Sequence, residues 1–311
     1  MLEYHDVVDG DQPRDGQVTG RTFARHLRHL REHFTIVTLA EATRELRSRS
    51  PLQHDYLVIT FDDGYADNYR VAWPLIAEHG LTATIFVTTG FLDGEPLWFD
   101  MARCCLRSIS GGEVGPSVAS RLTTALSEVF PDWRPDDGTA PEKTAARMKY
   151  ASPPDRERLT TLMREMALRE ALAQPLSWEE ARSIDRAGGE IGAHTISHPI
   201  LSQLPACDQE REIVGSRDRV AAELSRAPVS FAYPNGSQRD FDAVTCNLVA
   251  SAGFEAACTT VAGSNRAGCD PFRLHRLGVG EDTVAQLDAR LAGLFDQRIR
   301  RPSIRIGAAK A

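Results

Sequence analysis

The sequence predicts an α/β protein built on a parallel sheet that is closed or nearly closed into a barrel. Strand-like and helix-like segments alternate along most of its 311 residues, which is the pattern of repeated βα units. The strand-like segment 56–61 (YLVITF) is a continuous apolar run bounded by turn residues, as expected for a strand buried on both faces, and a further strand-like segment follows at 82–88 (TATIFVT). Together these observations favour a barrel of parallel strands surrounded by helices.

The expected elements follow one another in a regular order. A short strand at 2–5 precedes a helix at 22–34, in which Phe23, Leu27 and Leu30 recur on one face. Further strands are expected at 36–39, 56–61, 82–88, 190–193, 229–233, 254–259 and 273–279. Further helices of the barrel are expected at 40–47, 68–80, 178–188, 208–225, 241–253 and 284–295.

Residues 95–175 interrupt this alternation. They contain a glycine pair at 111–112, a stretch rich in Pro and Asp at 131–143, and expected helices at 117–130 and 154–172. We interpret the segment as a helical insertion on one face of a single domain that spans residues 1–300, and not as a second domain. The basic tail at 301–311 is expected to be flexible.

The composition excludes several classes of protein. Hydrophobic residues make up 42% of the chain and charged residues 25%, which is ordinary for a globular protein and excludes disordered and fibrous classes. The formal net charge of −7 gives no excess of positive charge with which to bind nucleic acid or an anionic membrane. No window approaches the roughly 18 consecutive apolar residues that a membrane span requires.

The N-terminus and the cysteines bear on localisation. The first residues, MLEYHD, lack the basic and apolar regions of a signal peptide, so we expect a cytoplasmic protein unless the start codon is mis-assigned or the sequence is trimmed. The six cysteines are scattered without CxxC pairs, which favours free thiols in a reducing compartment over a disulfide framework.

The strongest local motif is the Asp62-Asp63-Gly64 turn that ends the 56–61 strand. Neighbouring strand residues point to opposite faces, so two adjacent carboxylates share a site only where the strand ends and the chain turns. Gly64 permits that turn, and in parallel α/β folds this end of a strand is where sites form. The alternative is a simple turn in which one aspartate caps the next helix.

Two histidines follow another buried strand in the same way. His194 and His198, in the segment HTISH, come directly after the strand at 190–193, and this spacing lets both imidazoles converge on one cation. The alternative is a pair of ordinary surface histidines. One carboxylate with two imidazoles is the ligand set of a catalytic divalent metal, with positions left open for water and substrate.

A third motif, FAYPNG, ends the strand at 229–233. Pro234 cannot continue a central strand and Gly236 permits a tight turn, so the backbone must swing outward after Tyr233. The alternative is a plain loop that terminates the strand. The glycosylation acceptor pattern at 235–237 is discounted, because nothing in the sequence indicates secretion.

With these three motifs in this order, the chain resembles the polysaccharide deacetylases, the NodB-homology family of carbohydrate esterases, from Leu2 to about Val279. The resemblance implies a distorted (β/α)7-type barrel in which Asp62 is the catalytic base. It also implies that Asp63, His194 and His198 are the metal ligands and that the backbone N–H of Tyr233 helps to bind the oxyanion. Zinc is the expected metal, because imidazole and carboxylate suit it; cobalt, nickel and iron(II) are compatible with the same ligands.

The chain also departs from the family pattern. Phe231 stands where many members have an arginine that orients the base, so Arg276 is our candidate substitute; the alternative for Arg276 is a surface salt bridge. The family's late Leu-x-x-His segment is absent, but Leu2-Glu3-Tyr4-His5 reproduces it at the N-terminus. His5 is therefore the first candidate for the general acid, and His275 the second.

The resemblance implies a metal-dependent hydrolase that removes an N-acetyl group from an amino sugar. With no export signal in view, the expected substrate is small, nucleotide-linked, lipid-linked or a natural-product glycoside. Deformylation and O-deacetylation use the same machinery and stay open, as does a catalytically silent carbohydrate-binding protein on this fold.

Several side chains are candidates for contacts with the sugar. We expect Tyr65, Tyr233, Pro234 and His275 to contribute to substrate binding. The aromatic residues in or near the insertion are candidates for stacking on sugar rings, with core packing as the alternative. They are Trp98, Phe99, Trp133, Tyr150 and Trp178.

Overall fold

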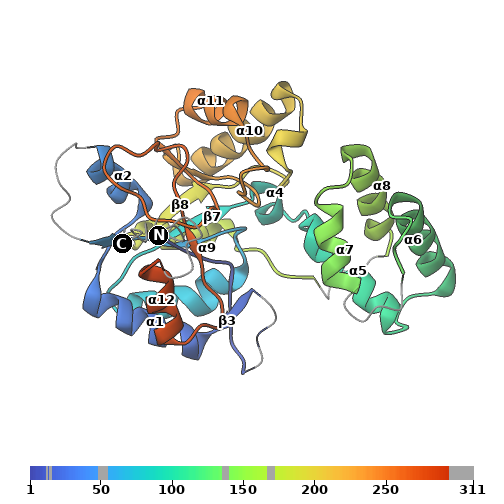
Figure 1. Ribbon diagram of the computed structural model, residues 1–311, viewed down its shortest axis with the longest axis horizontal. Helices are drawn as coiled ribbons and strands as arrows, with labels where there is room; N and C mark the ends of the chain where they lie inside the picture. The colour runs from blue at the N-terminus through green and yellow to red at the C-terminus, as the bar shows by residue number, and fades with distance from the viewer. Residues whose placement is uncertain (12, 14–15, 48–54, 135–139, 167–171, 294–311) are drawn as a thin grey trace, which may run out of the picture.

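The structure is a computed structural model that describes residues 1–293, except 12, 14–15, 48–54, 135–139 and 167–171 (Figure 1). The expected tail at 301–311 lies outside the described residues. No helix among the described residues is long and apolar enough to cross a membrane.

A curled, wholly parallel sheet of seven strands forms the centre of the protein, as predicted. Its order is β10 (Ala256–Cys258), β9 (Ser230–Ala232), β8 (Glu190–Ala193), β7 (Thr84–Val87), β6 (Ile59–Phe61), β1 (Leu2–Tyr4) and β11 (Leu277–Gly278). Six of these strands are buried along their whole length, because helices and loops cover both faces: they are β1, β6, β7, β8, β9 and β10.

The segment 271–279 brings the two edges of the sheet together. Leu274 forms a parallel bridge with Cys258 at one edge, and Leu277 and Gly278 pair with β1 at the other. The strand expected at 273–279 is therefore divided between two neighbours, and only its last part belongs to β11. This connection places Arg276, between the two pairings, inside the barrel, where it is fully buried.

The helices of the barrel lie close to the expected positions. They are α1 (Gly20–His33), α2 (Leu39–Arg47), the π-helix η1 (Asn68–Ala72), α3 (Trp73–Glu78), α9 (Trp178–Arg186), α10 (Ala206–Leu224), α11 (Ala243–Ser251) and α12 (Val284–Leu291). In Figure 1, α1 and α12 lie side by side, and His29 of α1 approaches Asp288 of α12. Two short helical segments, α4 (Thr89–Leu92) and η3 (Leu201–Gln203), follow strands β7 and β8.

Two short strand pairs depart from the predicted pattern. The run 56–61 is divided: β5 (Tyr56–Leu57) pairs with β4 (Thr35–Ile36), and only residues 59–61 enter the central sheet as β6. The pair β2 (Asp6–Val8) and β3 (Gln17–Thr19) was not predicted from the sequence. Both pairs are too short to produce a hydrophobic alternation that a sequence window would detect.

The segment 95–175 forms a group of four helices with an apolar core of their own. The helices are α5 (Trp98–Ser110), α6 (Pro116–Val129), α7 (Ala140–Met148) and α8 (Pro153–Arg164). They lie together to the right of the barrel in Figure 1 and pack around buried residues that include Leu106, Leu126, Met148 and Leu159. The sequence predicted α6 and α8 but not α5 and α7.

Candidate metal centre and catalytic site

The candidate residues converge at the carboxyl ends of the barrel strands. Asp62 and Asp63 follow β6, His194 follows β8, and His5 follows β1. In parallel barrels these ends lie at one rim, which is where active sites form. Residues distant in the sequence therefore share one site.

The backbone at this rim adopts unusual conformations. Asp63, Thr195 and His198 have positive φ angles of 73°, 66° and 56°. Each such residue costs on the order of 1–3 kcal/mol, and such strain concentrates at functional sites. Gly64 also has a positive φ, of 86°, and a Cβ there would lie only 2.9 Å from Leu92 Cδ1, so the turn requires glycine.

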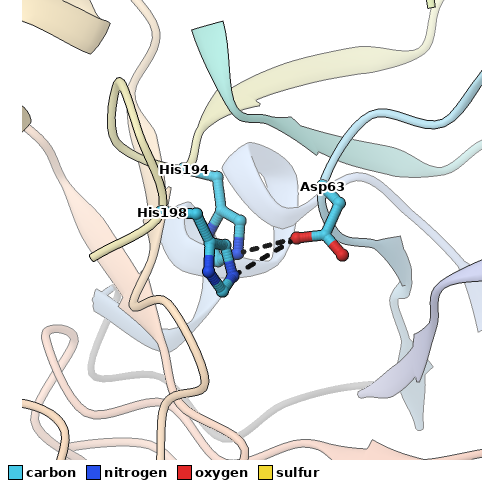
Figure 2. Close-up of side chains that lie close together, drawn as sticks. All are labelled: Asp63, His194 and His198. Atoms are coloured by element: carbon cyan, nitrogen blue, oxygen red, sulfur yellow. Dashed lines mark ion pairs between the residues drawn. The ribbon is translucent and has the colours of Figure 1, made fainter. Parts of the chain in front are cut away.

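Asp63, His194 and His198 form a compact buried group (Figure 2). The Oδ1 atom of Asp63 lies 3.5 Å from His194 Nε2 and 3.4 Å from His198 Nε2. Ligand atoms of the three side chains all lie within 4.8 Å of one another. Their exposed fractions are 2%, 1% and 5%, so the group is shielded from bulk water.

The donors of this group fit a divalent metal ion. Asp63 Oδ1 is buried and has no hydrogen-bond partner among the described residues, an arrangement that is costly unless a cation occupies the site. The Nδ1 atom of His194 lies 2.8 Å from the carbonyl of Ala232, which leaves Nε2 toward the site, as is usual for a metal-ligating histidine.

The electrostatics of His198 and Asp63 favour the protonation states that a metal requires, whereas at His194 the nearby carboxylates of Asp63 and Asp62 outweigh burial and raise the pKa. Burial lowers the pKa of His198 to about 4, which keeps that imidazole neutral. Burial alone would raise the pKa of Asp63, but the neighbouring histidines hold it well below its usual range, so the carboxylate is ionised. A neutral imidazole and an ionised carboxylate are the ligand forms.

Arg276 holds Asp62 with two hydrogen bonds. Its Nη1 and Nη2 atoms donate to Asp62 Oδ1 and Oδ2 at 2.6 and 2.7 Å, and further bonds to Thr60 Oγ1 and the Thr259 carbonyl fix the guanidinium. Arg276 has no exposed surface, so the alternative of a surface salt bridge is wrong. Burial would raise the pKa of Asp62, but the guanidinium lowers it, and the carboxylate is therefore ionised and fixed in orientation.

Glu3 is a buried carboxyl group at this site that the sequence analysis did not single out. Its oxygens lie 3.6 Å from Arg276 Nε and 3.8 Å from His5 Nε2, and it is 6% exposed. Glu3, His5 and Asp62 also form a group of metal-ligand type, but the Arg276 guanidinium already supplies the positive charge there. Because all three residues of β1 are buried, no alternation in the sequence marks Glu3 as an inward-facing residue.

His5 lies beside the carboxylate of Asp62. Its ring is part of the group with Glu3 and Asp62, and Asn68, at the start of the π-helix, donates to its backbone carbonyl at 2.7 Å. Burial lowers the pKa of His5, but the carboxylates of Glu3, Asp63 and Asp62 outweigh this and raise it. His275 instead places Nδ1 3.1 Å from the Val261 carbonyl.

The expected oxyanion contact at Tyr233 requires a correction. The backbone N–H of Tyr233 donates to the Cys258 carbonyl at 3.1 Å, so the ladder between adjacent strands already uses that donor. The side chain is fully buried, donates its hydroxyl to the Phe272 carbonyl at 2.9 Å and stacks on Phe241. Tyr233 therefore supports the loop that begins at Pro234, which is itself buried.

The aromatic candidates differ in their surroundings. Tyr65 is 6% exposed and donates its hydroxyl to Asp100 of α5 at 2.7 Å. Trp133 is buried in the core of the insertion, as the packing alternative stated, whereas Tyr150 is 55% exposed. Trp178 donates to Asp93 at 2.8 Å, and Trp98 and Phe99 lie against His198.

The curled parallel sheet surrounded by helices has the fold of the NodB type. The chain belongs to the polysaccharide deacetylase family, whose model matches residues 49–257. Glu3, His5 and Arg276 lie outside that match and reach the site through β1 and the segment 271–279.

Known proteins are similar to this chain in part of the sequence or in fold. The chain is 34% identical over 88 residues to the putative polysaccharide deacetylase YxkH of Bacillus subtilis (strain 168), and this match covers 28% of the chain and 30% of YxkH. The fold is similar to a Streptococcus pyogenes deacetylase, PplD, in complex with acetate (TM-score 0.61, 18% identity, 93% of this chain and 96% of that chain). It is also similar to IcaB from Ammonifex degensii (TM-score 0.60, 20% identity, 93% and 94%).

Proposed function

We propose that this protein is a metal-dependent hydrolase that removes the N-acetyl group from an amino sugar or glycoconjugate. The observation that carries the proposal is the buried group of Asp63, His194 and His198 with the fixed carboxylate of Asp62 beside it. A binding protein would have no use for a base fixed by a buried arginine next to an orphaned carboxylate oxygen.

Asp63, His194 and His198 would hold the metal, for which zinc is the expected ion. When bound there, a divalent ion would lower the pKa of a water molecule and polarise the substrate carbonyl. The three side chains are already close together and buried, so little reorganisation is needed to bind the ion.

Asp62 acts as the general base. Its carboxylate is ionised and accepts the proton of the attacking water, while Arg276 keeps both of its oxygens in a fixed orientation. Because Arg276 is buried and itself fixed by Thr60 and Thr259, the base has little freedom to rotate away from the reacting atoms.

His5 acts as the general acid. Its raised pKa keeps the ring protonated to a higher pH than an ordinary histidine, and Glu3 lies on one side of that ring at 3.8 Å. The protonated imidazole gives its proton to the departing nitrogen, so that acetate and a free amine are released. Glu3 is a positioning residue in this scheme, because it contacts His5 and Arg276 and not the substrate.

The proposal is tested by measuring acetate release from N-acetylglucosamine-containing oligosaccharides, nucleotide sugars and lipid-linked saccharides by the zinc-loaded protein. Release of acetate with formation of a free amine is expected, and Asp62→Asn is the matched inactive control. Release of formate from a formamido sugar, or of acetate from O-acetyl esters alone, would replace the N-acetyl assignment. A zinc-loaded protein that cleaves none of these substrates would contradict the proposal.

A further inference from the structure

The two histidines of the metal group are supported differently. His194 places Nδ1 2.8 Å from the Ala232 carbonyl, whereas the Nδ1 atom of His198 is buried and has no hydrogen-bond partner among the described residues. Metal-ligating histidines almost always donate this second ring N–H to a carbonyl, carboxylate or water, which fixes the orientation of the ring. Among the described residues, other contacts therefore orient His198.

The first residues of helix α5 in the insertion supply contacts to His198. The ring of Phe99 packs against the His198 ring with centroids 4.9 Å apart and planes at 65°. The indole Nε1 of Trp98 donates to the His198 carbonyl at 3.0 Å. Phe99 therefore restrains the imidazole of His198, and Trp98 restrains its peptide unit.

The backbone of His198 makes this support important. Its φ of 56° is in the left-handed region, and the next residue is Pro199, which has no N–H to donate. On the other side, the His198 N–H donates to Thr195 Oγ1 at 3.1 Å. The bond from Trp98 completes the restraint of this strained residue.

The beginning of α5 is itself anchored to the barrel. Tyr65 donates to Asp100 at 2.7 Å, and Arg103 lies over the Phe99 ring at 5.3 Å while it pairs with Asp100 at 3.1 Å. The rings of Trp98 and Phe99 meet edge to face at 5.4 Å. These contacts give Phe99 a defined position against His198.

We propose that Trp98 and Phe99 are positioning residues for the metal ligand His198, so that the helical insertion is a working part of the metal centre. The inference rests on the proposed function, because it assigns His198 to a metal. It replaces the expectation that these two aromatic rings serve to stack on sugar. It also gives the insertion a function that a passive addition to the barrel would lack.

The test is the dissociation constant of Zn²⁺, measured by competition with a chromophoric chelator on full-length apoprotein. Trp98→Phe keeps the aromatic bulk and removes only the N–H, and Phe99→Leu keeps the apolar character and removes the ring. We expect each to weaken Zn²⁺ binding by about 10–100-fold, the usual effect of losing support for a ligand. Phe99→Tyr keeps the aromatic ring and should bind Zn²⁺ with the affinity of the parent protein.

Two matched controls lie in the same insertion. Trp133→Phe removes an indole hydrogen bond to Thr144, 2.8 Å long, in the core of the insertion and away from His198. Phe130→Leu removes a ring that also lies under an arginine, Arg147, at 4.6 Å. Both should leave the Zn²⁺ dissociation constant unchanged, whatever they do to the melting temperature.

The absorption spectrum of the Co²⁺-loaded proteins gives a second measurement, since its visible bands report the ligand geometry. We expect the bands to change in Trp98→Phe and Phe99→Leu but not in the controls. Unchanged affinity and spectra in Trp98→Phe and Phe99→Leu would overturn the inference, as would a rise in substrate KM alone. Failure of the parent chain to bind Zn²⁺ or Co²⁺ would instead contradict the proposed function.

Discussion

Replacing Arg276 by methionine gives the most demanding test of the catalytic site. The change removes the positive partner of two buried carboxyl groups, Asp62 at 2.6 and 2.7 Å and Glu3 at 3.6 Å, and leaves similar apolar volume in its place. Breaking one side of a buried ion pair costs about 3–5 kcal/mol, because the remaining charge stays buried without compensation. We therefore expect a melting temperature lower by roughly 10 °C at neutral pH.

The pH dependence of this loss follows from the pKa of Asp62. In the parent protein the ion pair with Arg276 lowers the pKa of Asp62 from its ordinary value of 3.8. The pair therefore stabilises the fold above pH 3.8, and this stabilisation is lost as the pH falls through the pKa of Asp62 in the folded state. Without Arg276, burial dominates and raises the pKa of Asp62, so the folded variant prefers the protonated carboxyl group. The difference in melting temperature between parent and Arg276→Met should accordingly be largest at neutral pH and shrink as the pH is lowered.

Activity should fall together with stability. A general base contributes about 10²–10⁴-fold to the rate, and we expect kcat/KM of Arg276→Met to fall within this range because Asp62 loses both its orientation and its charge. Arg276→Lys should recover much of the stability but little of the activity, because an ammonium group lacks the planar fork that holds both oxygens.

Arg156→Met is the matched control for Arg276→Met. Arg156 is also almost buried, at 8% exposed, but it donates to the Lys149 carbonyl and to Gln203 Oε1 and not to a carboxylate. Its loss should show no comparable pH-dependent change in melting temperature and no direct effect on the base. Differential scanning calorimetry across a pH series, with acetate-release kinetics, measures both quantities. An Arg276→Met protein with parental kcat/KM and an unchanged melting profile would refute the reasoning.

Three further changes separate the roles of the other groups. Asp62→Asn should lower kcat by about 10²–10⁴-fold while zinc content, measured by mass spectrometry, stays at the parental level; equal loss of zinc would make Asp62 a ligand. His5 has a pKa raised from 6.5, so activity should decline only above that pH, as the acid deprotonates. His5→Gln should remove this alkaline decline from the pH profile of kcat/KM. An alkaline decline that persists in His5→Gln would exclude His5 as the acid. Tyr233→Phe should lower the free energy of unfolding by about 1 kcal/mol, because the 2.9 Å hydrogen bond to the Phe272 carbonyl is lost, and should leave kcat unchanged at saturating substrate. A large fall in kcat alone would place the hydroxyl in the reaction.

Much of the site could be predicted from the sequence, because its motifs stand at strand ends. The run that leads to Asp62 and Asp63 reads as a buried strand, and parallel strands present their carboxyl ends at one rim. The same reasoning placed His194 and His198 beside them. The bond between Arg276 and Asp62 was also expected, although it joins residues 214 positions apart.

Other features depend on contacts that a sequence does not display. Glu3 escaped notice because all three residues of β1 are buried, so no alternation marked an inward-facing carboxyl group. The N–H of Tyr233 was expected to be free, but the alignment of β9 with β10 assigns it to the Cys258 carbonyl. The contact of Phe99 with His198 depends on how α5, a helix missed in the sequence, docks on the barrel.

Anomalous diffraction from crystals of the zinc-loaded protein, recorded on both sides of the zinc absorption edge, tests the central claim most directly. The account predicts one zinc ion at about 2.0–2.2 Å from Asp63 Oδ1 and the Nε2 atoms of His194 and His198. Zinc absent from these three side chains, or bound instead between Glu3 and His5, would contradict it.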